Sequence, residues 1–420
     1  MTMAGIDQLV EPSLTWSTHR LSVIIPAYNE EDGIAEIVDR VLSIQPQLEA
    51  VGVDGPEVIV VDDGSKDRTV EIVRGYSNVR LIIHAQNRGY GGALKTGFSN
   101  ATGNLLSFLD ADSTYPPESF PELCQEIIKG ADLVIGSRMA GAKSEMPPTR
   151  RLGNFIFANL VSLVGNQHVT DSASGMRVFR KETLERMYPL PDGLNFTPVM
   201  STRAIHEGLK MVEVPIPYSE RSGRSKLSVV KDGMRFFNSI IWTALSYNPV
   251  RVLGLIGLAG IGFAAVVALM LIVLRANGIN QLGPWGIFAV FSAAVLGVAG
   301  VSLFSLGAMF NYLVSLFQKK VEQRGLFGKP IFNPPLDRQF WWIGGLAVIA
   351  GFVVGVGTLV LGFNGWTLNQ LWLWMLVSAM STIIGIQLIV SWIVMRVLEE
   401  VSIREVKQAS DMLGNAKRSD

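Results

Sequence analysis

The stretch from Leu105 to Glu118, LLSFLDADSTYPPE, decides how the rest of this sequence is interpreted. Its apolar first half predicts a buried strand, and the pair Pro116-Pro117 prevents that strand from continuing. Asp110 and Asp112 therefore follow the carboxyl end of the strand. In an open parallel sheet that edge binds ligands, and two carboxylates there suit Mg²⁺ or Mn²⁺ bound to a diphosphate. A lone Asp-x-Asp turn is also common at protein surfaces, so the surrounding sequence must decide between the two readings.

The composition indicates at least two domains and argues against several classes of protein. The chain has 420 residues, and its 36 Lys and Arg residues balance 36 Asp and Glu residues. No net charge therefore favours nucleic acid as a partner. Cys124 is the single cysteine, which excludes an internal disulfide and suits a reducing compartment. The first 20 residues lack the pattern of a signal peptide, so we expect the first domain to stay in the cytoplasm.

The first half of the sequence alternates strands and helices. Strands are predicted at 21–26, 57–61, 79–84, 105–109 and 131–136, with helices at 34–42 and 67–75 and a glycine-rich helix that begins at Gly89. This alternation predicts a mostly parallel sheet whose ligand-binding loops lie on one edge. Met211–Ile216 predicts a further strand, antiparallel or at an edge because it contains Pro215.

The second half is rich in apolar helices. Leu152–Val161 and the region 228–246 place apolar side chains beside basic ones, which is typical of helices in a membrane interface. The connection 318–340 is basic, so the positive-inside rule predicts that this loop, the first domain and the C-terminal tail share the cytoplasm. Four segments contain no charged residue and meet the span length of about 20 residues: Val252–Leu274, Trp285–Phe317, Trp341–Phe363 and Leu371–Met395.

Eight short motifs occur in a fixed order and together carry a family resemblance. They are PAYNE (26–30), DDGS (62–65), NRG (87–89), DAD (110–112), GSR (136–138), DSASGMR (171–177), EVPI (213–216) and RSGRSK (221–226). In this order they closely resemble glycosyltransferase family 2 with the GT-A fold, specifically polyprenyl-phosphate sugar synthases such as dolichyl-phosphate mannose synthase. The resemblance covers residues 21 to 226 and implies a Rossmann-like α/β catalytic domain with a mostly parallel sheet.

The donor of such an enzyme is a nucleotide sugar, whose sugar leaves only if the departing diphosphate is neutralised. We expect Asp110 and Asp112 to hold the Mg²⁺ or Mn²⁺ ion that does this. Core packing would equally explain two of the pocket residues, Tyr28 and Val61. The residues that the resemblance and the chemistry assign to the nucleotide sugar are Pro26, Tyr28, Glu30, Val61, Asp63, Asp110, Ala111, Asp112 and Lys226.

A lipid monophosphate acceptor is already ionised near neutral pH, so it needs cations to place it rather than a general base. Arginine offers a planar fork for phosphate, although Arg150 and Arg151 could instead contact lipid head groups. The loop 221–226 is expected to close over the diphosphate. The candidates for the acceptor phosphate are Arg138, Arg150, Arg151 and Arg224, and those for catalysis are Asp112, Arg138 and Arg224.

Two departures from the family pattern limit what can be carried over. Thr114 stands where the family often has a Gln that serves the metal, so we expect water to replace that ligand. The region 197–200 lacks the acidic residue that the family commonly carries there, so sugar recognition is expected to differ from that of the mannose enzymes.

The sequence therefore predicts inverting, metal-dependent transfer of one sugar from a UDP- or GDP-sugar to a dolichyl or undecaprenyl phosphate. The sequence leaves open whether the protein forms a homo-oligomer. A processive polysaccharide synthase is less favoured because no Gln-x-x-Arg-Trp element is present, and a flippase or scaffold because the spans carry no charge. The predicted parts are an N-terminal extension (1–20), a GT-A catalytic domain (21–227), juxtamembrane interfacial helices (228–250), four transmembrane helices (251–396) and a cytoplasmic tail (397–420).

Overall fold

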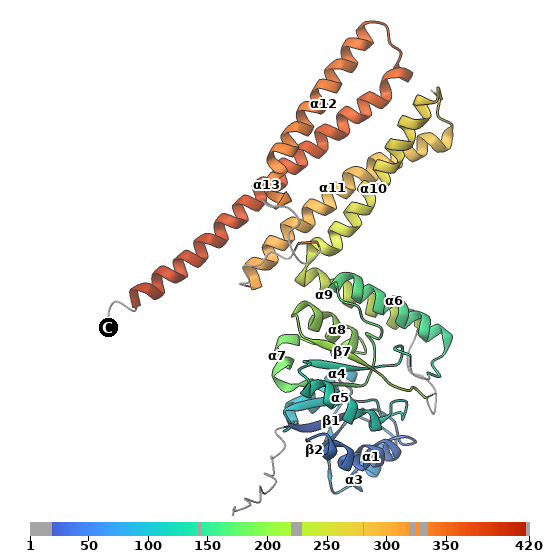
Figure 1. Cartoon of the computed structure of the whole chain (residues 1–420), viewed down its shortest axis with the longest axis vertical. Helices are drawn as coiled ribbons and strands as arrows, with labels where there is room; N and C mark the ends of the chain where they lie inside the picture. Colours follow the sequence, from blue (N-terminus) through green and yellow to red (C-terminus); the bar gives the residue numbers. More distant parts are fainter. Residues whose placement is uncertain are drawn as a thin grey trace, which may run out of the picture. The chain divides into compact units, whose positions relative to one another are not determined.

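The protein folds as two compact units that divide between Ile240 and Ile241 (Figure 1). The computed structural model describes residues 19–141, 144–219, 229–279, 281–318, 325–326 and 335–416. The predicted loop 221–226 and most of the basic connection 318–340 lie outside these ranges. The first unit mixes strands and helices, whereas the second is helical.

A sheet forms the centre of the first unit. Within the described residues its strands are β1 (His19–Ala27), β2 (Val53–Asp62), β3 (Val79–Ile83), β4 (Leu105–Phe108), β5 (Leu133–Ser137), β6 (Arg177–Arg180) and β7 (Met211–Pro215), in the order β3-β2-β1-β4-β6-β5-β7. All neighbours pair in parallel except β6, which runs antiparallel to β4 and β5. The mostly parallel sheet is therefore confirmed, with β7 as an edge strand parallel to β5. The sequence did not predict β6, a run of four residues with an arginine at each end.

Helices cover both faces of the sheet and bury its alternating apolar side chains. The helices in the described part of the first unit are α1 (Ile34–Ser43), α2 (Gln45–Ala50), α3 (Thr69–Arg74), α4 (Tyr90–Asn100), α5 (Phe120–Ile128), α6 (Pro148–Gly165), α7 (Leu184–Met187) and α8 (Phe196–His206), and α9 (Val229–Tyr247) continues past its boundary. Along β1, Val23 and Ile25 join the core that contains α1 and α5, whereas Ile24 joins the core that contains α4 and α8. This packing fixes the sheet so that the loops after β1, β2, β4 and β5 share one edge.

Glycines at the start of α4 let a distant segment pack directly on the helix backbone. A Cβ atom at Gly91 would overlap the carbonyl oxygen of Pro191, and one at Gly89 would lie 2.6 Å from that of Asp192. The amide of Gly92 donates a hydrogen bond to the same Asp192 carbonyl at 3.1 Å. The glycine-rich start of the helix therefore fixes the chain that leads into α8.

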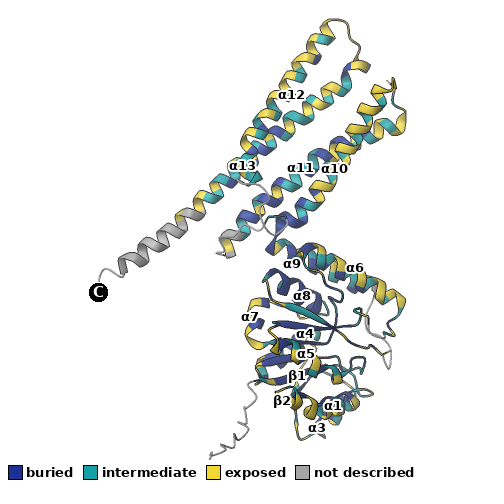
Figure 2. Cartoon of the chain, in the orientation of Figure 1, coloured by how far each residue is buried: buried dark blue, intermediate teal, exposed yellow. Residues whose placement is uncertain are grey.

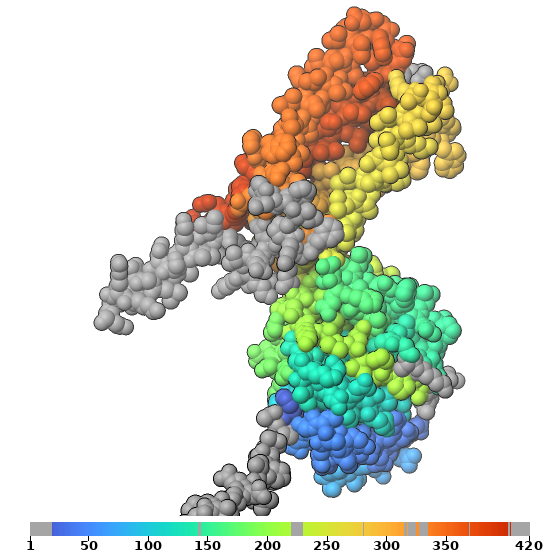
Figure 3. Space-filling model, in the orientation of Figure 1, coloured from blue at the N-terminus to red at the C-terminus, as the bar shows by residue number. Residues whose placement is uncertain are grey.

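The described part of the second unit consists of long helices: α10 (Pro249–Ala276), α11 (Pro284–Gln318), α12 (Phe340–Phe363) and α13 (Leu368–Ala416). Each contains a stretch long and apolar enough to cross a membrane, which confirms the four predicted spans. Many large apolar side chains of these helices are exposed. Figure 2 marks exposed residues along them, and Figure 3 draws the same helices as a space-filling surface in yellow to red. Helices of this length that are apolar on every side are typical of membrane spans.

Glycines bring these helices together in pairs. α10 and α11 approach at Gly257 and Gly300, where a Cβ on either residue would lie 2.5 Å from the carbonyl oxygen of the other. α12 and α13 approach in the same way at Gly344 and Gly385, and the two pairs join where α11 contacts α13. Because lipid is as apolar as these side chains, close backbone packing rather than exclusion of water holds such helices together.

Replacing Gly300 by Leu should destabilise the second unit, because a side chain there has no space between α10 and α11. Overpacking of this kind costs about 1–3 kcal/mol, so the thermal midpoint of the full chain in detergent should fall by several degrees. Gly262 provides the control, because a Cβ there meets no atom within 4 Å. Gly262→Leu should leave the midpoint unchanged, and equal midpoints for both variants would contradict the close packing at Gly300.

Candidate active site

A cavity of about 520 Å³ opens at the carboxyl ends of β1, β2, β4 and β5. Its walls come from the loops after these strands and from α6, α8 and α9. The residues predicted from the sequence that line it are Pro26, Tyr28, Glu30, Asp63, Asp110, Ala111, Asp112, Arg138 and Arg150. Residues from five separate segments of the chain therefore meet in one place.

Four predicted residues are absent from the described walls. Val61 is fully buried in the core that contains α4, so it packs the sheet rather than shaping the pocket. Arg151 is exposed on α6 beside Arg150, because successive helical residues point about 100° apart. Arg224 and Lys226 fall outside the described residues.

Two carboxylates in the loop after β4 line the cavity, and each is oriented by a neutral hydroxyl. Tyr90 Oη donates a hydrogen bond to Asp110 Oδ1 at 2.8 Å, and Thr114 Oγ1 donates to Asp112 Oδ1 at 2.7 Å. Burial and the Asp110 charge raise the pKa of Tyr90, so its hydroxyl stays protonated. Within the described residues, no group of three His, Cys, Asp or Glu side chains forms a protein cage for a metal ion.

The loop 171–177 packs against this carboxylate turn at Gly175. A Cβ atom at Gly175 would lie 2.7 Å from Asp110 Oδ2, so only glycine leaves the carboxylate its space. The amide of Gly175 also donates a hydrogen bond to Tyr115 Oη at 2.7 Å. The position of Asp110 therefore depends on a loop more than 60 residues further along the chain.

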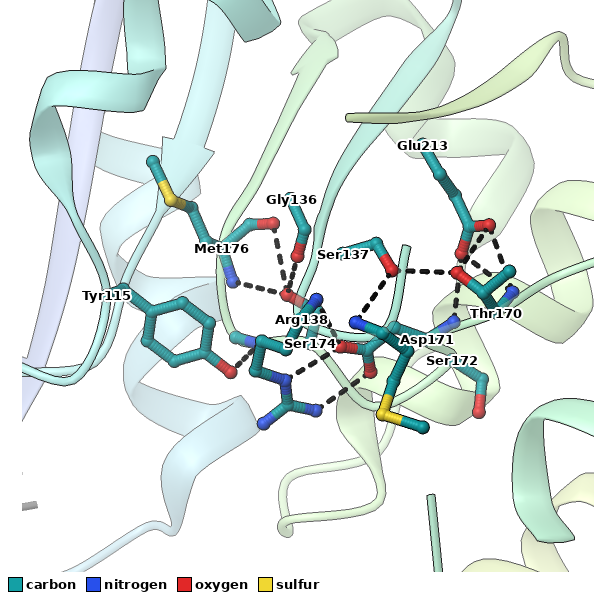
Figure 4. Close-up of polar contacts among 12 residues, drawn as sticks. Tyr115, Gly136, Ser137, Arg138, Thr170, Asp171, Ser172, Ser174, Met176 and Glu213 are labelled. Atoms are coloured by element: carbon teal, nitrogen blue, oxygen red, sulfur yellow. Dashed lines mark hydrogen bonds and ion pairs between the residues drawn. The ribbon is translucent and has the colours of Figure 1, made fainter. Parts of the chain in front are cut away.

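Arg138 and Asp171 form a buried ion pair beneath the cavity (Figure 4). Arg138 Nε lies 2.7 Å from Asp171 Oδ2, and Nη2 lies 2.8 Å from Oδ1. The rings of Tyr115 and Tyr218 flank the guanidinium, with centroids 5.6 and 5.4 Å from its central carbon. Burial raises the pKa of the Asp171 carboxyl, but the charge and hydrogen bonds of Arg138 outweigh burial, so that pKa is lowered.

The pairing changes the role expected for Arg138. The sequence made Arg138 a candidate for the acceptor phosphate because arginine offers a planar fork for phosphate. In the structure the Nε and Nη2 edge is used by Asp171, and no described residue accepts a hydrogen bond from Nη1. Arg138 lines the cavity, so it can offer a ligand its charge and Nη1, whereas its Nε and Nη2 edge is held by Asp171.

Asn154 is a cavity residue that sequence reasoning missed. It is buried on α6, four residues after Arg150, and lines the cavity. Its amide is close enough to Asp171 to help lower the pKa of that carboxyl, yet it makes no hydrogen bond of regular geometry with any described residue. Buried polar groups usually have partners, so an Asn inside the apolar run 152–161, which holds Asn154 and Asn159, was the available signal.

α6 and α9 form the apolar wall of the cavity and expose apolar side chains on their outer faces. Phe157 and Phe236 line the cavity with ring centroids 5.7 Å apart. Figure 2 shows exposed residues along α6, at the surface of the first unit. The large apolar side chains exposed on α6 and on the part of α9 in this unit are Leu152, Phe155, Ile156, Leu163, Val230, Met234 and Phe237.

Comparison with known proteins gives two family matches. The description "Glycosyl transferase family 2" matches residues 22–188, and a domain of unknown function, DUF8752, matches residues 249–409. A dolichyl-phosphate hexose transferase of Haloferax volcanii is 32% identical over 228 residues, which are 54% of this chain and 94% of that protein. The chain belongs to glycosyltransferase family 2. The predicted family and the prediction of a glycosyltransferase with a GT-A catalytic domain are thereby confirmed.

Two further similarities cover part of the chain. The low-salt glycan biosynthesis hexosyltransferase Agl6 of Haloferax volcanii is 33% identical over 231 residues, and the match spans 54% of this chain and 54% of that protein. Among solved structures, glucosyl-3-phosphoglycerate synthase from Mycobacterium tuberculosis, in complex with Mn²⁺, uridine diphosphate and phosphoglyceric acid, is 20% identical. That match covers 54% of this chain and 79% of the other, with a TM-score of 0.45.

Asp171→Asn should destabilise the first unit by about 3–5 kcal/mol, because it leaves the buried Arg138 charge without its partner. The double variant Arg138→Met, Asp171→Leu should recover most of this stability but not the transfer activity, because the cavity then lacks the positive charge of Arg138. Thermal unfolding of the full chain and a product assay measure the two effects. A double variant as active as wild type would show that Arg138 serves only the fold.

The ion pair between Arg138 and Asp171 should also make the stability of the first unit depend on pH. Because the folded-state pKa of Asp171 is lowered, its contribution is fully present above the ordinary carboxyl pKa of about 4 and is lost as pH falls through the lowered value. Wild type should therefore lose more of its thermal midpoint than the double variant below about pH 4. An equal fall in thermal midpoint for wild type and the double variant would mean that the ion pair does not contribute to the pH dependence of stability.

Proposed function

We propose that the protein transfers one sugar from a nucleotide sugar to a polyprenyl phosphate, with inversion at the anomeric carbon. A single observation carries this proposal: one cavity joins Asp63, the carboxylates Asp110 and Asp112, and the cationic side chain of Arg150 on α6. Such a cavity offers a place for a base, a diphosphate and an anionic acceptor in sequence. The relative named dolichyl-phosphate hexose transferase supports a polyprenyl phosphate as the acceptor.

The donor nucleotide is assigned to the end of the cavity formed by the loops after β1 and β2. Pro26 and Tyr28 provide flat apolar surface there, and Glu30 and Asp63 provide carboxylate acceptors. A base and a ribose present the N–H and O–H groups that such acceptors bind. The Kd measurements with UDP and GDP described below for His84 distinguish the two nucleotides.

A divalent metal ion fits the carboxylates at the centre of the cavity. Asp110 and Asp112 supply only oxygen, the ligand that Mg²⁺ and Mn²⁺ prefer. Two protein carboxylates leave positions for substrate phosphate oxygens and water, which is how Mg²⁺ is usually bound with nucleotides. Bound there, the ion would neutralise the charge that develops on the departing diphosphate. Tyr90 and Thr114 hold these carboxylates in place through their hydroxyl hydrogen bonds.

The acceptor phosphate is assigned to the wall formed by α6 and the loop after β5. Arg150, Nη1 of Arg138 and the amide of Asn154 can donate hydrogen bonds to its oxygens. A phosphate oxygen ionised at neutral pH attacks without a general base. Attack on the side of the anomeric carbon opposite the diphosphate breaks its bond to that group and inverts the configuration.

The outer faces of α6 and α9 are assigned to a lipid surface. Exposed Phe155, Ile156 and Met234 would be unfavourable in water but suit the boundary between head groups and acyl chains. The spans of the second unit support a membrane protein, and the basic connection 318–340 supports a cytoplasmic first unit. A polyprenyl chain could then stay in lipid while its phosphate enters the cavity.

Asp112→Ala should reduce transfer at least a hundredfold while the protein stays folded, because the diphosphate loses one of its two metal carboxylates. The assay incubates purified full chain with Mn²⁺, a radiolabelled UDP- or GDP-sugar and a polyprenyl phosphate, and counts label extracted into organic solvent. Asp39→Asn, an exposed change on α1, is the matched control. Unchanged turnover in Asp112→Ala would remove the metal role, and a polymeric product would favour a processive synthase.

Replacing Phe155 and Ile156 together by Ser should raise the KM for a long polyprenyl phosphate in liposomes several-fold. The KM for the nucleotide sugar should not change, because neither side chain lines the cavity. Ile128→Ser is the control, since Ile128 is an exposed apolar residue on α5. If the α6 variant and the control gave the same KM for the lipid, the outer face of α6 would not contact the membrane.

A further inference from the structure

A buried imidazole lies behind the donor end of the cavity without lining it. His84 follows β3, and 6% of its side chain is exposed. Its Nδ1 lies 2.7 Å from Asp63 Oδ1, and its Nε2 lies 2.9 Å from Thr96 Oγ1 on α4. Because an ionised carboxylate only accepts hydrogen bonds, Nδ1 carries the hydrogen of the first contact. His84 therefore connects α4 to the carboxylate of Asp63.

Hydrogen bonds from three donors fix this carboxylate. His84 Nδ1 and the amide of Arg88 donate to Oδ1 at 2.7 and 2.8 Å, and the amide of Gly89 donates to Oδ2 at 2.8 Å. A carboxylate offers about four lone-pair sites, so one site on Oδ2 stays open in the described structure. Asp63 itself lines the cavity.

His84 supplies the one side-chain hydrogen bond to the Asp63 carboxylate among the described residues. The two backbone donors belong to adjacent residues in the loop that precedes α4. Without His84, Oδ1 would keep a single donor, and the carboxylate could rotate about its Cβ–Cγ bond. Thr96 Oγ1 steadies the other side of the imidazole, and it also lies within hydrogen-bond distance of the carbonyl oxygen of Gly92, at 3.1 Å.

We propose that His84 is a positioning residue for the donor nucleotide: it orients Asp63 so that the open lone pair on Oδ2 receives a base N–H. Uracil and guanine both present a ring N–H of this kind. The inference rests on the proposed function, because it requires a nucleotide at this end of the cavity. It assigns His84 no contact with substrate, so the effect of its loss falls on donor binding rather than on the transfer step.

Two substitutions separate the two hydrogen bonds of the imidazole. Asn places its amide nitrogen near the position of Nδ1, so His84→Asn keeps a donor for Asp63. Gln places its amide nitrogen near the position of Nε2, so His84→Gln keeps the contact with Thr96 and loses the one with Asp63. UDP and GDP, each with Mn²⁺, are the probes, and their Kd values for the full chain are measured by calorimetry.

For the nucleotide that wild type binds, His84→Gln should raise the Kd about tenfold, the worth of one hydrogen bond to a charged group. His84→Asn should stay within about threefold of wild type. In turnover, His84→Gln should raise the KM for the donor while kcat and the KM for the lipid acceptor stay near wild type. A general loss of packing would affect both variants alike and would move the thermal midpoint.

Equal Kd values for His84→Gln and wild type, or equal weakening by both variants, would overturn the inference. A His84→Gln variant that lowered kcat and left the Kd unchanged would also overturn it. If His84→Gln does not fold, Thr96→Val carries the test, since it removes the partner of Nε2 and leaves the imidazole in place: a few-fold rise in Kd supports the proposal and no change overturns it. Wild type that binds neither UDP nor GDP would instead defeat the proposed donor, and this inference with it.

Discussion

The buried ion pair between Arg138 and Asp171 is the constraint on which the site depends. It ties the end of β5 to the loop 171–177, and through Tyr115 it reaches the turn that carries the carboxylates. Charges this deeply buried are tolerated only when both partners are closely paired and hydrogen-bonded. The pair therefore forces these segments into one geometry. Glu213 on β7 supports the pair by accepting hydrogen bonds from the backbone amides of Thr170 and Asp171.

Features that repeat along the chain could be predicted from the sequence. The strands β1 to β5 and the four spans were found because apolar runs and their breaks are local signals. Asp110 and Asp112 were placed correctly at a strand end because Pro116 and Pro117 mark where that strand must stop. The local sequence pattern was therefore enough to predict the sheet edge at which the cavity lies.

Features that depend on distant partners could not be predicted in this way. β6 inserts between β4 and β5 out of chain order, and four residues give too little pattern to show it. The guanidinium edge of Arg138 is taken by a residue 33 positions away, which no spacing rule reveals. Val61 was placed in the pocket although strand alternation turns it into the core. In each case the packing of the folded chain decided between alternatives that the sequence left equal.

α6 carries cavity residues on one side and uncovered apolar side chains on the other. If α6 contacts lipid as proposed, the enzyme collects its acceptor from within the plane of the membrane. The frequency of encounters then follows the mole fraction of acceptor within the lipid layer, not its amount per litre. Inert lipid added to such a system acts as a diluent, and turnover falls although the total quantity of every reactant is unchanged.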